Sequence, residues 1–411
     1  MASAPKQPVI IVGAGVVGLA LAQGLKKEGI PFIVFDRDEH IDACGHGWAI
    51  TLWALEALGH CLPARLLARL EEIEIDPTDD RKQGGTFTMY NLKTAEPTMK
   101  VTLSHQRRID REKLRKLLCD GIDVQWNKTL KDFTETDKGM LVSFEDGTSV
   151  LGSLVVGVDG AQSKVRQQLC PTTHELHQLP IRFLGTTIKM SPEEAKVFTE
   201  LDKLMFQATH PDTGTFFWYA LLGAPAVNGS DNTSDPHYRC QLNISWPVKT
   251  PDDEIPATNA GRVRKIKLLA EVFEARFKKP VMDIPEDLNI VEIKFRKWPV
   301  LPWPTLGGKI TLAGDAAHAM TMYRGEAANH GITDANVLKD NLVKMWASEG
   351  GISQDEALQS YEANMRPRTL WSVNASRQAW LDSHDHEKSN VGSGLVSVQE
   401  ANKVAVPISV G

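Results

Sequence analysis

A glycine-rich turn constrains the fold of this chain more than any other feature. The apolar run Val9–Val12 predicts a buried strand, and a helix is predicted to follow it and end near Lys27. Between them, Gly13, Gly15 and Gly18 have the spacing GxGxxG. The first glycine permits a tight turn, the second lets a pyrophosphate approach the backbone, and the third lets the helix pack closely on the strand. The helix N-terminus then offers N–H donors and partial positive charge to the phosphates.

Asp36 extends this pattern. The apolar run 32–35 predicts the next buried strand, and Asp36 follows it, where a carboxylate can accept hydrogen bonds from ribose hydroxyls. The strand–helix–strand unit predicts an α/β fold with a doubly wound, dinucleotide-binding sheet. The motif alone does not separate NAD from FAD, and Arg37 beside Asp36 does not settle the choice between NADH and NADPH.

The composition is that of an ordinary globular protein, long enough for two domains. The 411 residues are 42% hydrophobic and 24% charged, and the net charge of −6 does not favour a nucleic-acid partner. Five cysteines lie far apart without metal-ligand spacing, and no apolar run approaches the ~20 residues that span a bilayer. We therefore expect a cytoplasmic protein with no metal and no membrane span. The oligomeric state stays open.

Two later motifs carry a resemblance to a known family. Asp159–Gly160 follows the predicted strand 154–156, and Gly314–Asp315, in GDAAH, follows the predicted strand 309–313. Together with the glycine turn, these motifs resemble in order and spacing the FAD-dependent aromatic hydroxylases, the single-component flavoprotein monooxygenases typified by p-hydroxybenzoate hydroxylase. The similarity covers roughly residues 9 to 367 and is nearest to members from secondary-metabolite pathways.

The resemblance implies that the chain binds FAD without a covalent link. Arg111 would reach the pyrophosphate or ribityl region, and Asp159 would serve both FAD and an incoming nicotinamide cofactor. The backbone from Ala327 would face the flavin pyrimidine, where a helix N-terminus stabilises negative charge on the reduced ring. The chain departs from the family pattern at Met322, usually proline, and at Ala327, usually glycine. The expected cofactor-binding residues are Gly13, Ala14, Gly15, Val17, Gly18, Asp36, Arg37, Gly47, Ala49, Arg111, Asp159, Gly160, Gly314, Asp315, Ala327, Ala328 and Asn329.

The region between the motifs has a different character and predicts a substrate domain. Aromatic strands at 216–219 and 241–246, with an amphipathic helix near 265–277, indicate a β-sheet inserted into the nucleotide-binding domain. The expected boundaries are 1–75, 100–178 and 290–350 for the FAD-binding domain, 76–99 and 179–289 for the substrate domain, 351–385 for a helical C-terminal segment and 386–411 for a weakly patterned tail.

Alternate residues of the strand 216–219 point to opposite faces of its sheet. One face is expected to line the substrate pocket, either Phe217 with Tyr219 or Phe216 with Trp218, and the sequence does not decide which. Because the flavin is the reactive centre, no side chain is identified as a general base. His318 is expected to position the loop after Asp315 rather than to react. The candidates for the pocket are Tyr219, His46, Tyr323, Arg182, Gln207 and Asn243.

The activity that the resemblance implies is a monooxygenation. NADH or NADPH would bind transiently, since no second GxGxxG is present, and would reduce the flavin. Reduced flavin and O2 would form a C4a-hydroperoxide that transfers one oxygen atom to a small organic substrate, expected to be an aromatic or polycyclic natural product. Baeyer–Villiger oxidation or epoxidation on the same scaffold and a non-catalytic flavin-binding sensor are the alternatives. The substrate, the regiochemistry and the choice between NADH and NADPH stay open.

Overall fold

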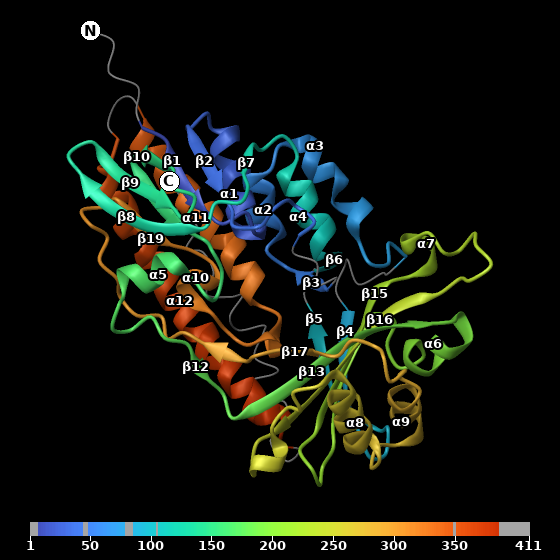
Figure 1. Ribbon diagram of the computed structural model, residues 1–411. Helices are drawn as coiled ribbons and strands as arrows, with labels where there is room; N and C mark the ends of the chain where they lie inside the picture. The colour runs from blue at the N-terminus through green and yellow to red at the C-terminus, as the bar shows by residue number, and fades with distance from the viewer. Residues whose placement is uncertain (1–6, 44–47, 79–84, 104–105, 348–350, 386–411) are drawn as a thin grey trace.

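A parallel sheet and a large, mainly antiparallel sheet lie at opposite ends of the molecule (Figure 1). The computed structural model describes residues 7–43, 48–78, 85–103, 106–347 and 351–385. We call the two parts of the molecule the parallel-sheet half and the antiparallel-sheet half. No helix among the described residues is long and apolar enough to cross a membrane.

The parallel sheet has five strands in the order β19-β11-β1-β2-β7. Its central strands are buried on both faces, which explains why their sequences are continuously apolar rather than alternating. The predicted strand–helix–strand unit is confirmed, with α1 (Val16–Lys27) connecting the first two strands. The strands are β1 (Val9–Val12), β2 (Phe32–Phe35), β7 (Val124–Gln125), β11 (Leu154–Gly157) and β19 (Ile310–Leu312).

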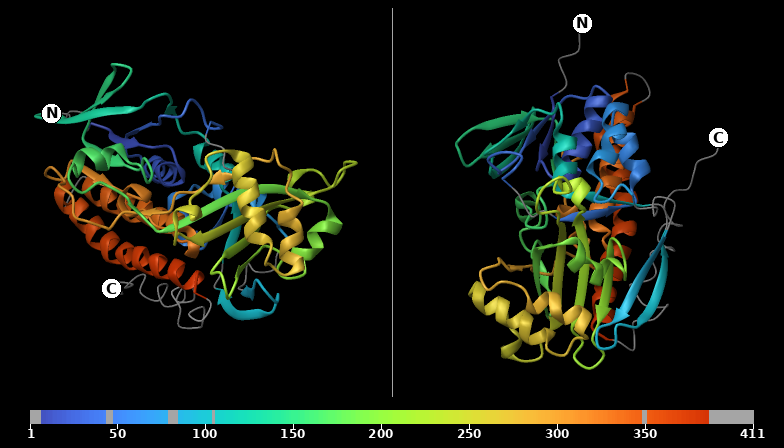
Figure 2. Two further views of the ribbon diagram at one scale, coloured as in Figure 1. Left: turned by 60° about the horizontal axis from the view of Figure 1, so that its bottom comes forward. Right: turned by 90° about the vertical axis from the view of Figure 1, so that its right-hand side faces the viewer.

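Helices cover one face of the parallel sheet, and a small antiparallel sheet covers the other (Figure 2). Phe35 of β2 packs on Phe144 of β9, with 4.5 Å between ring centroids. The small sheet consists of β8 (Leu130–Thr136), β9 (Gly139–Phe144) and β10 (Ser149–Gly152). The helices of this half are α2 (Leu55–Cys61), α3 (Ala64–Leu67), η1 (Ala68–Ile73), α4 (Arg111–Cys119), α5 (Lys164–Leu169), α10 (Asp315–His318), η4 (Met322–Arg324) and α11 (Ala327–Trp346), and a short sheet pairs β3 (Ala49–Leu52) with β6 (Arg107–Asp110).

The antiparallel-sheet half contains seven strands in the order β17-β13-β16-β15-β14-β4-β5, of which only the pair β14 and β4 runs parallel. The described helices α6, α8 and α9 bury an aromatic core on one face of this sheet. The strands are β4 (Gly85–Asn91), β5 (Pro97–Leu103), β13 (Ile181–Met190), β14 (Met205–Thr209), β15 (Phe216–Gly223), β16 (Tyr238–Pro247) and β17 (Val291–Glu292). The other elements are α6 (Pro192–Thr199), α7 (Pro225–Asn228), η3 (Pro251–Asp253), α8 (Asn259–Ala270) and α9 (Ala275–Met282), with the small pair β12 (His177–Gln178) and β18 (Arg296–Lys297).

Two details differ from the sequence-based expectations. The amphipathic segment expected as one helix near 265–277 is two helices, because the Glu274 side chain accepts the N–H of Arg276 and caps a new helix. The large sheet also extends beyond the expected substrate-domain ranges, since β5 continues to Leu103 and β17 begins at Val291. The domain boundaries themselves stay a prediction.

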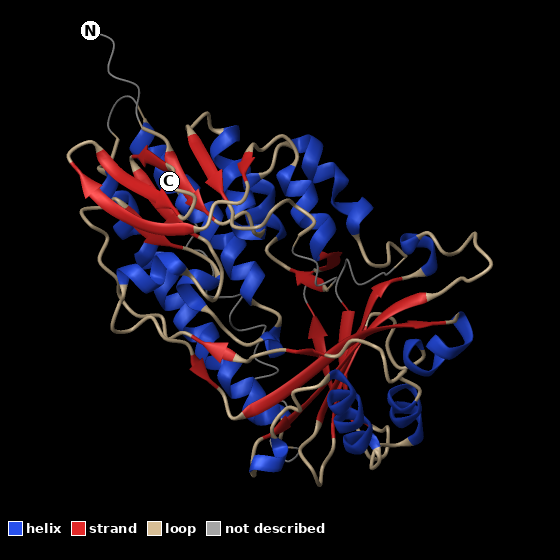
Figure 3. Cartoon of the chain, in the orientation of Figure 1, coloured by secondary structure: helices blue, strands red, loops and turns tan. Residues whose placement is uncertain are grey.

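The last described helix, α12 (Gln354–Ser383), runs from the parallel-sheet half to the antiparallel-sheet half (Figures 1 and 3). Its first turn is stabilised by a capping box between Ser353 and Glu356. At its far end, Thr209 Oγ1 donates to the Ser383 carbonyl at 2.9 Å, and His384 Nδ1 lies 2.6 Å from the Gly214 carbonyl. These bonds connect the helical segment to the large sheet.

Candidate active site

A cavity of about 570 Å³ lies where the two halves meet. The parallel-sheet half contributes the glycine turn, β3, the loop after β11, the segment after β19 and the start of α11. The antiparallel-sheet half contributes β14, β15 and the segment 293–296. A cavity of this volume is typical of sites for small molecules and cofactors.

The glycine turn packs so tightly that two of its glycines have no room for a side chain. A Cβ on Gly13, which has φ +121°, would lie 2.5 Å from the Val158 oxygen, and a Cβ on Gly18 would lie 2.0 Å from the Gly13 oxygen. At Gly15, by contrast, no atom lies within 4 Å of the Cβ position, and the residue faces the cavity. The open space beside the α1 N-terminus therefore fits a pyrophosphate.

Asp36 is held against this turn at the end of β2. Its Oδ2 accepts the N–H of Ala14 at 2.5 Å, and its Oδ1 accepts the N–H of Asp38 at 2.8 Å. A carboxylate has about four lone-pair positions, so acceptor capacity remains for ribose hydroxyls. Arg115 of α4 supports the same turn by donating Nε to the Ala14 carbonyl at 2.8 Å and a terminal nitrogen to Asp38 at 2.9 Å. Sequence reasoning missed Arg115, whose only signal is its place one helical turn after Arg111.

Arg166 connects the two later motifs. It is almost completely buried and donates to the Ala316 carbonyl at 2.9 Å and the Ala161 carbonyl at 2.5 Å. The loop after β11 and the turn after β19 therefore lie side by side at the cavity. Gly160, with φ +81° and no atom within 4 Å of its Cβ position, leaves the backbone there accessible.

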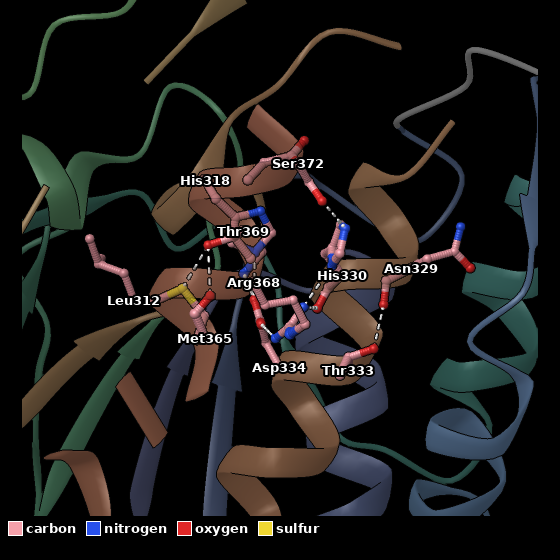
Figure 4. Close-up of polar contacts among 12 residues, drawn as sticks. Leu312, His318, Asn329, His330, Thr333, Asp334, Met365, Arg368, Thr369 and Ser372 are labelled. Atoms are coloured by element: carbon pink, nitrogen blue, oxygen red, sulfur yellow. Dashed lines mark hydrogen bonds and ion pairs between the residues drawn. The ribbon is translucent and has the colours of Figure 1, made fainter. Parts of the chain in front are cut away.

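A buried network behind Gly314 holds the turn after β19 (Figure 4). One carboxylate oxygen of Asp334 in α11, Oδ2, accepts the Gly314 N–H at 2.9 Å and lies 2.6 Å from His318 Nε2. The other oxygen, Oδ1, accepts a hydrogen bond from Arg368 of α12 at 2.6 Å. Burial raises the pKa of Asp334, but the charges of His318 and Arg368 outweigh it and lower the pKa to about 2. Asp334 is therefore ionised at neutral pH, and sequence reasoning did not identify it.

The network continues across α12 through His330 (Figure 4). Arg368 lies 2.7 Å from His330 Nδ1, and His330 Nε2 lies 2.6 Å from the Ser372 hydroxyl. Burial and the adjacent charge of Arg368 lower the pKa of His330 well below its usual value, so its ring is neutral. Because a guanidinium only donates, Nδ1 accepts and Nε2 carries the hydrogen that goes to Ser372.

The start of α11 also contributes to the wall of the cavity. Ala327 and Ala328 line the cavity. Asn329 instead turns its side chain away: its Oδ1 accepts the N–H of Trp53 at 2.8 Å, and its Nδ2 donates to the Thr51 carbonyl at 2.9 Å. Asn329 thus fixes the start of α11 to the end of β3.

The large sheet presents Trp218, not Tyr219, to the cavity. Trp218 pairs across the strands with Gln207, and both line the cavity. Tyr219 and Phe217 point to the opposite face, where both are fully buried in the aromatic core. Burial raises the pKa of Tyr219 well above its usual value. The expectation that Tyr219 contributes to the pocket does not agree with this placement, because alternation along β15 carries it to the other face.

The other pocket candidates are placed differently from one another. Tyr323 lines the cavity, and its hydroxyl lies 3.0 Å from Ser245 Oγ and 3.1 Å from His384 Nε2. Arg182 lies outside the cavity lining: its Nε and Nη2 both donate to Glu254 at 2.6 Å, and its Nη1 donates to the Ile181 carbonyl at 2.8 Å. Asn243 is fully buried beside Trp218 without lining the cavity. His46 and Gly47 lie outside the described residues.

The expected cofactor residues divide into a lining set and a supporting set. Met322 and Ala327, the two departures from the family pattern, both line the cavity. Asp315 is exposed to the space of the cavity, and desolvation by the protein around that space raises the pKa of its carboxyl. No group of three His, Cys, Asp or Glu side chains that could hold a metal occurs in the part of the chain that the structure describes. The lining set is Gly15, Val17, Ala49, Arg111, Gly160, Gly314, Asp315, Ala327 and Ala328; the residues outside the lining are Gly13, Ala14, Gly18, Asp36, Arg37, Asp159 and Asn329.

Comparison with known proteins adds to this geometry. A family model described as an FAD binding domain matches residues 6–277 and 294–376. The FAD-dependent monooxygenase dbaB of Emericella nidulans is 46% identical over 355 residues, which is 85% of this chain and 90% of that protein. A probable FAD-dependent monooxygenase of Arthroderma benhamiae is 39% identical over 95% of this chain and 94% of its own length. The fold is also similar to the crystal structure of Klebsiella pneumoniae HpxO complexed with FAD and uric acid, with a TM-score of 0.74, 17% identity and coverage of 97% of this chain and 93% of that one.

Proposed function

The chain belongs to the FAD-dependent monooxygenases of this FAD-binding family and is therefore an oxidoreductase that acts on a small substrate. From this premise we propose how its cavity is used. We propose that NADH or NADPH is a transient co-substrate that reduces the bound FAD. When bound, FAD would supply the oxygen-transfer chemistry: with two electrons from NADH or NADPH, one atom of O2 would enter an aromatic or polycyclic substrate and the other would leave as water.

The cofactor would occupy the part of the cavity between the glycine turn and α11. The α1 N-terminus and Gly15 would hold the pyrophosphate with Arg111, and Asp36 would accept the adenosine ribose hydroxyls. Gly314 and Asp315 would hold the ribityl region. The N–H groups at the start of α11 would stabilise negative charge that develops on the flavin pyrimidine.

One observation carries this proposal: the open space at Gly15 and the wall formed by Trp218 and Gln207 belong to a single cavity. A dinucleotide and a small substrate can therefore lie against one another inside the same enclosure. Trp218 and its neighbours would orient the substrate over the flavin. They would also exclude bulk water, which would otherwise discharge the oxygen as H2O2.

The decisive experiment measures NADH- and NADPH-dependent oxygen uptake by the purified, FAD-containing protein. A panel of aromatic compounds is screened for faster flavin reduction, because substrate binding is expected to prepare the flavin for reduction. The substrate that accelerates reduction should gain one oxygen atom by mass spectrometry, with label from 18O2. A protein that binds no FAD, or that consumes neither nucleotide with any compound, would contradict the proposal.

We also propose that the protein acts in the cytoplasm. Four cysteines among the described residues are free thiols, and three of them are buried, which suits a reducing compartment. Imaging of the protein with a fluorescent tag in its own cells tests this proposal. Accumulation in a secretory compartment would contradict it.

A further inference from the structure

A buried ion pair lies at the start of α11, beside the cavity. Arg324 Nε and Nη2 donate to the two carboxylate oxygens of Glu326 at 3.0 and 2.8 Å, which is the bidentate geometry of a strong pair. The two side chains are 0% and 2% exposed. The chain turns between them at Gly325, which has φ +64°. Desolvation of two charges is costly, so a pair buried to this extent is weak evidence for stability alone.

The two partners lie at different depths relative to the cavity. Arg324 lines the cavity together with Ala327 and Ala328, whereas Glu326 lies outside the lining. Glu326 immediately precedes the first helical residue, Ala327, and so occupies the N-cap position of α11. The Arg324 guanidinium carbon also lies 5.1 Å from the ring centre of Trp371 in α12, within the range of a cation–π contact. The positive partner of the pair is thus the one that faces the cavity.

The charge of Glu326 acts against the dipole of the helix that it begins. The unpaired N–H groups at a helix N-terminus are equivalent to about half a positive elementary charge. A carboxylate at the N-cap carries a whole negative charge, so Glu326 alone would reverse the sign of the electrostatic potential at this helix start. The guanidinium of Arg324 cancels that charge and restores the positive sign on the cavity side.

The charges further along α11 are matched in the same way. A second buried carboxylate of this helix, Asp334, pairs with Arg368 at 2.6 Å. Burial lowers the pKa of His330, which lies between them in sequence, and its ring is neutral. Removal of either partner of the Arg324–Glu326 pair would therefore leave one uncompensated charge beside the cavity. Its effect there would be larger than in water, because the protein interior has a low dielectric constant.

We propose that the Arg324–Glu326 pair sets the reduction potential of the bound FAD. This inference rests on the proposed function, which places the flavin pyrimidine at the start of α11. A hydride from NADH or NADPH carries two electrons and one proton to the flavin and leaves the reduced ring with one negative charge. Arg324 stabilises that charge and Glu326 opposes it. The pair therefore holds the potential between the values that either residue alone would give.

The test measures the reduction potential of the FAD-loaded protein against a reference dye during slow anaerobic reduction. Glu326→Gln keeps the shape of the side chain and leaves Arg324 charged, because a guanidinium does not lose its proton in proteins. We expect this variant to shift the equilibrium about tenfold or more toward reduced flavin, which is ~30 mV for a two-electron couple. Arg324→Gln should shift it in the opposite direction. The double variant should return close to the unaltered protein.

Two kinds of control separate charge from structure. Arg324→Lys keeps the positive charge and should retain most of the potential of the unaltered protein. Arg182 and Glu254 form a second bidentate pair, at 2.6 Å, outside the cavity lining. Arg182→Gln and Glu254→Gln should each leave the potential unchanged, because neither charge lies beside the flavin.

The sign of the shifts decides the inference. A pair that only holds the loop together would give no shift, or shifts in the same direction for Glu326→Gln and Arg324→Gln, and either result would overturn it. If Arg324→Gln does not fold, an unchanged or lower potential in Glu326→Gln is sufficient to refute it. Failure of the proposed function has a different signature, which is the absence of NAD(P)H-dependent oxygen uptake in the unaltered protein. The potential is an equilibrium property that a dye reports without turnover.

Discussion

Replacing Asp334 by asparagine should remove a large part of the stability of the parallel-sheet half. The substitution keeps the side-chain volume but leaves the partly buried Arg368 guanidinium and the fully buried His318 without their counter-charge. Removing one partner of a buried ion pair costs about 3–5 kcal/mol. Since whole domains are stable by only about 5–15 kcal/mol, this loss should be easy to measure.

The pH dependence supplies an independent part of the same prediction. The pKa of Asp334 falls from 3.8 to about 2 in the folded protein, so its ionised form is favoured by folding. A depressed carboxyl pKa stabilises the protein above pH ~4, and that contribution is lost as the pH falls toward ~2. At ~1.4 kcal/mol per pKa unit, the shift corresponds to about 2–3 kcal/mol. Because Asp334→Asn has no carboxyl to protonate at this position, the variant should lose less stability than the unaltered protein as the pH falls from ~4 to ~2.

The assay is urea denaturation of the FAD-loaded protein at several pH values, with FAD affinity measured in parallel. FAD should bind more weakly to Asp334→Asn, because asparagine has a single oxygen and cannot accept hydrogen bonds from both Gly314 and Arg368, which use different oxygens of Asp334. Asp120→Asn serves as the control, since Asp120 is a surface carboxylate 2.7 Å from Arg65. If the two variants unfold at the same urea concentration, the network does not stabilise the fold and the reasoning is refuted.

Four further substitutions separate cofactor binding, substrate binding and folding. Gly15→Val should fold normally, because nothing in the protein lies within 4 Å of its Cβ position. The variant should bind no FAD, because the valine side chain would fill the space of the pyrophosphate, and full flavin content on purification would show that the dinucleotide binds elsewhere. Asp36→Ala should only weaken FAD binding, by about 1–2 kcal/mol in a titration, and loss of all binding would mean that Asp36 shapes the turn itself. Trp218→Ala should raise the H2O2 formed per NAD(P)H at normal flavin content, whereas Tyr219→Ala should leave that ratio unchanged and lower stability by about 3–5 kcal/mol. The opposite pattern would place the substrate on the other face of the sheet.

The elements that local sequence specifies were predictable. The strands at Val9–Val12 and Phe32–Phe35 are continuously apolar, and the first is followed by Gly13, whose φ of +121° favours glycine, so the local pattern predicts the fold. The face of β15 was not predictable, because Trp218 and Tyr219 are both aromatic and only the packing of α8 and α9 decides which is covered. Asp334 was missed for a related reason: its partner Arg368 lies far along the chain, in α12, and no local pattern marks the pair.

The order of strands in the large sheet has a consequence for how the chain reaches its native state. β4 pairs with β14, so Met89 must find Gln207 after the intervening chain has built much of the other half. Pairings between residues so distant in sequence close long loops at an entropic cost before any contact compensates for it, and such topologies fold slowly. Until β14 arrives, the β4–β5 hairpin keeps an unpaired edge that can join strands of other molecules. Nascent chains should therefore be most prone to aggregate while this edge is exposed, and slower synthesis at low temperature should raise the yield of folded protein.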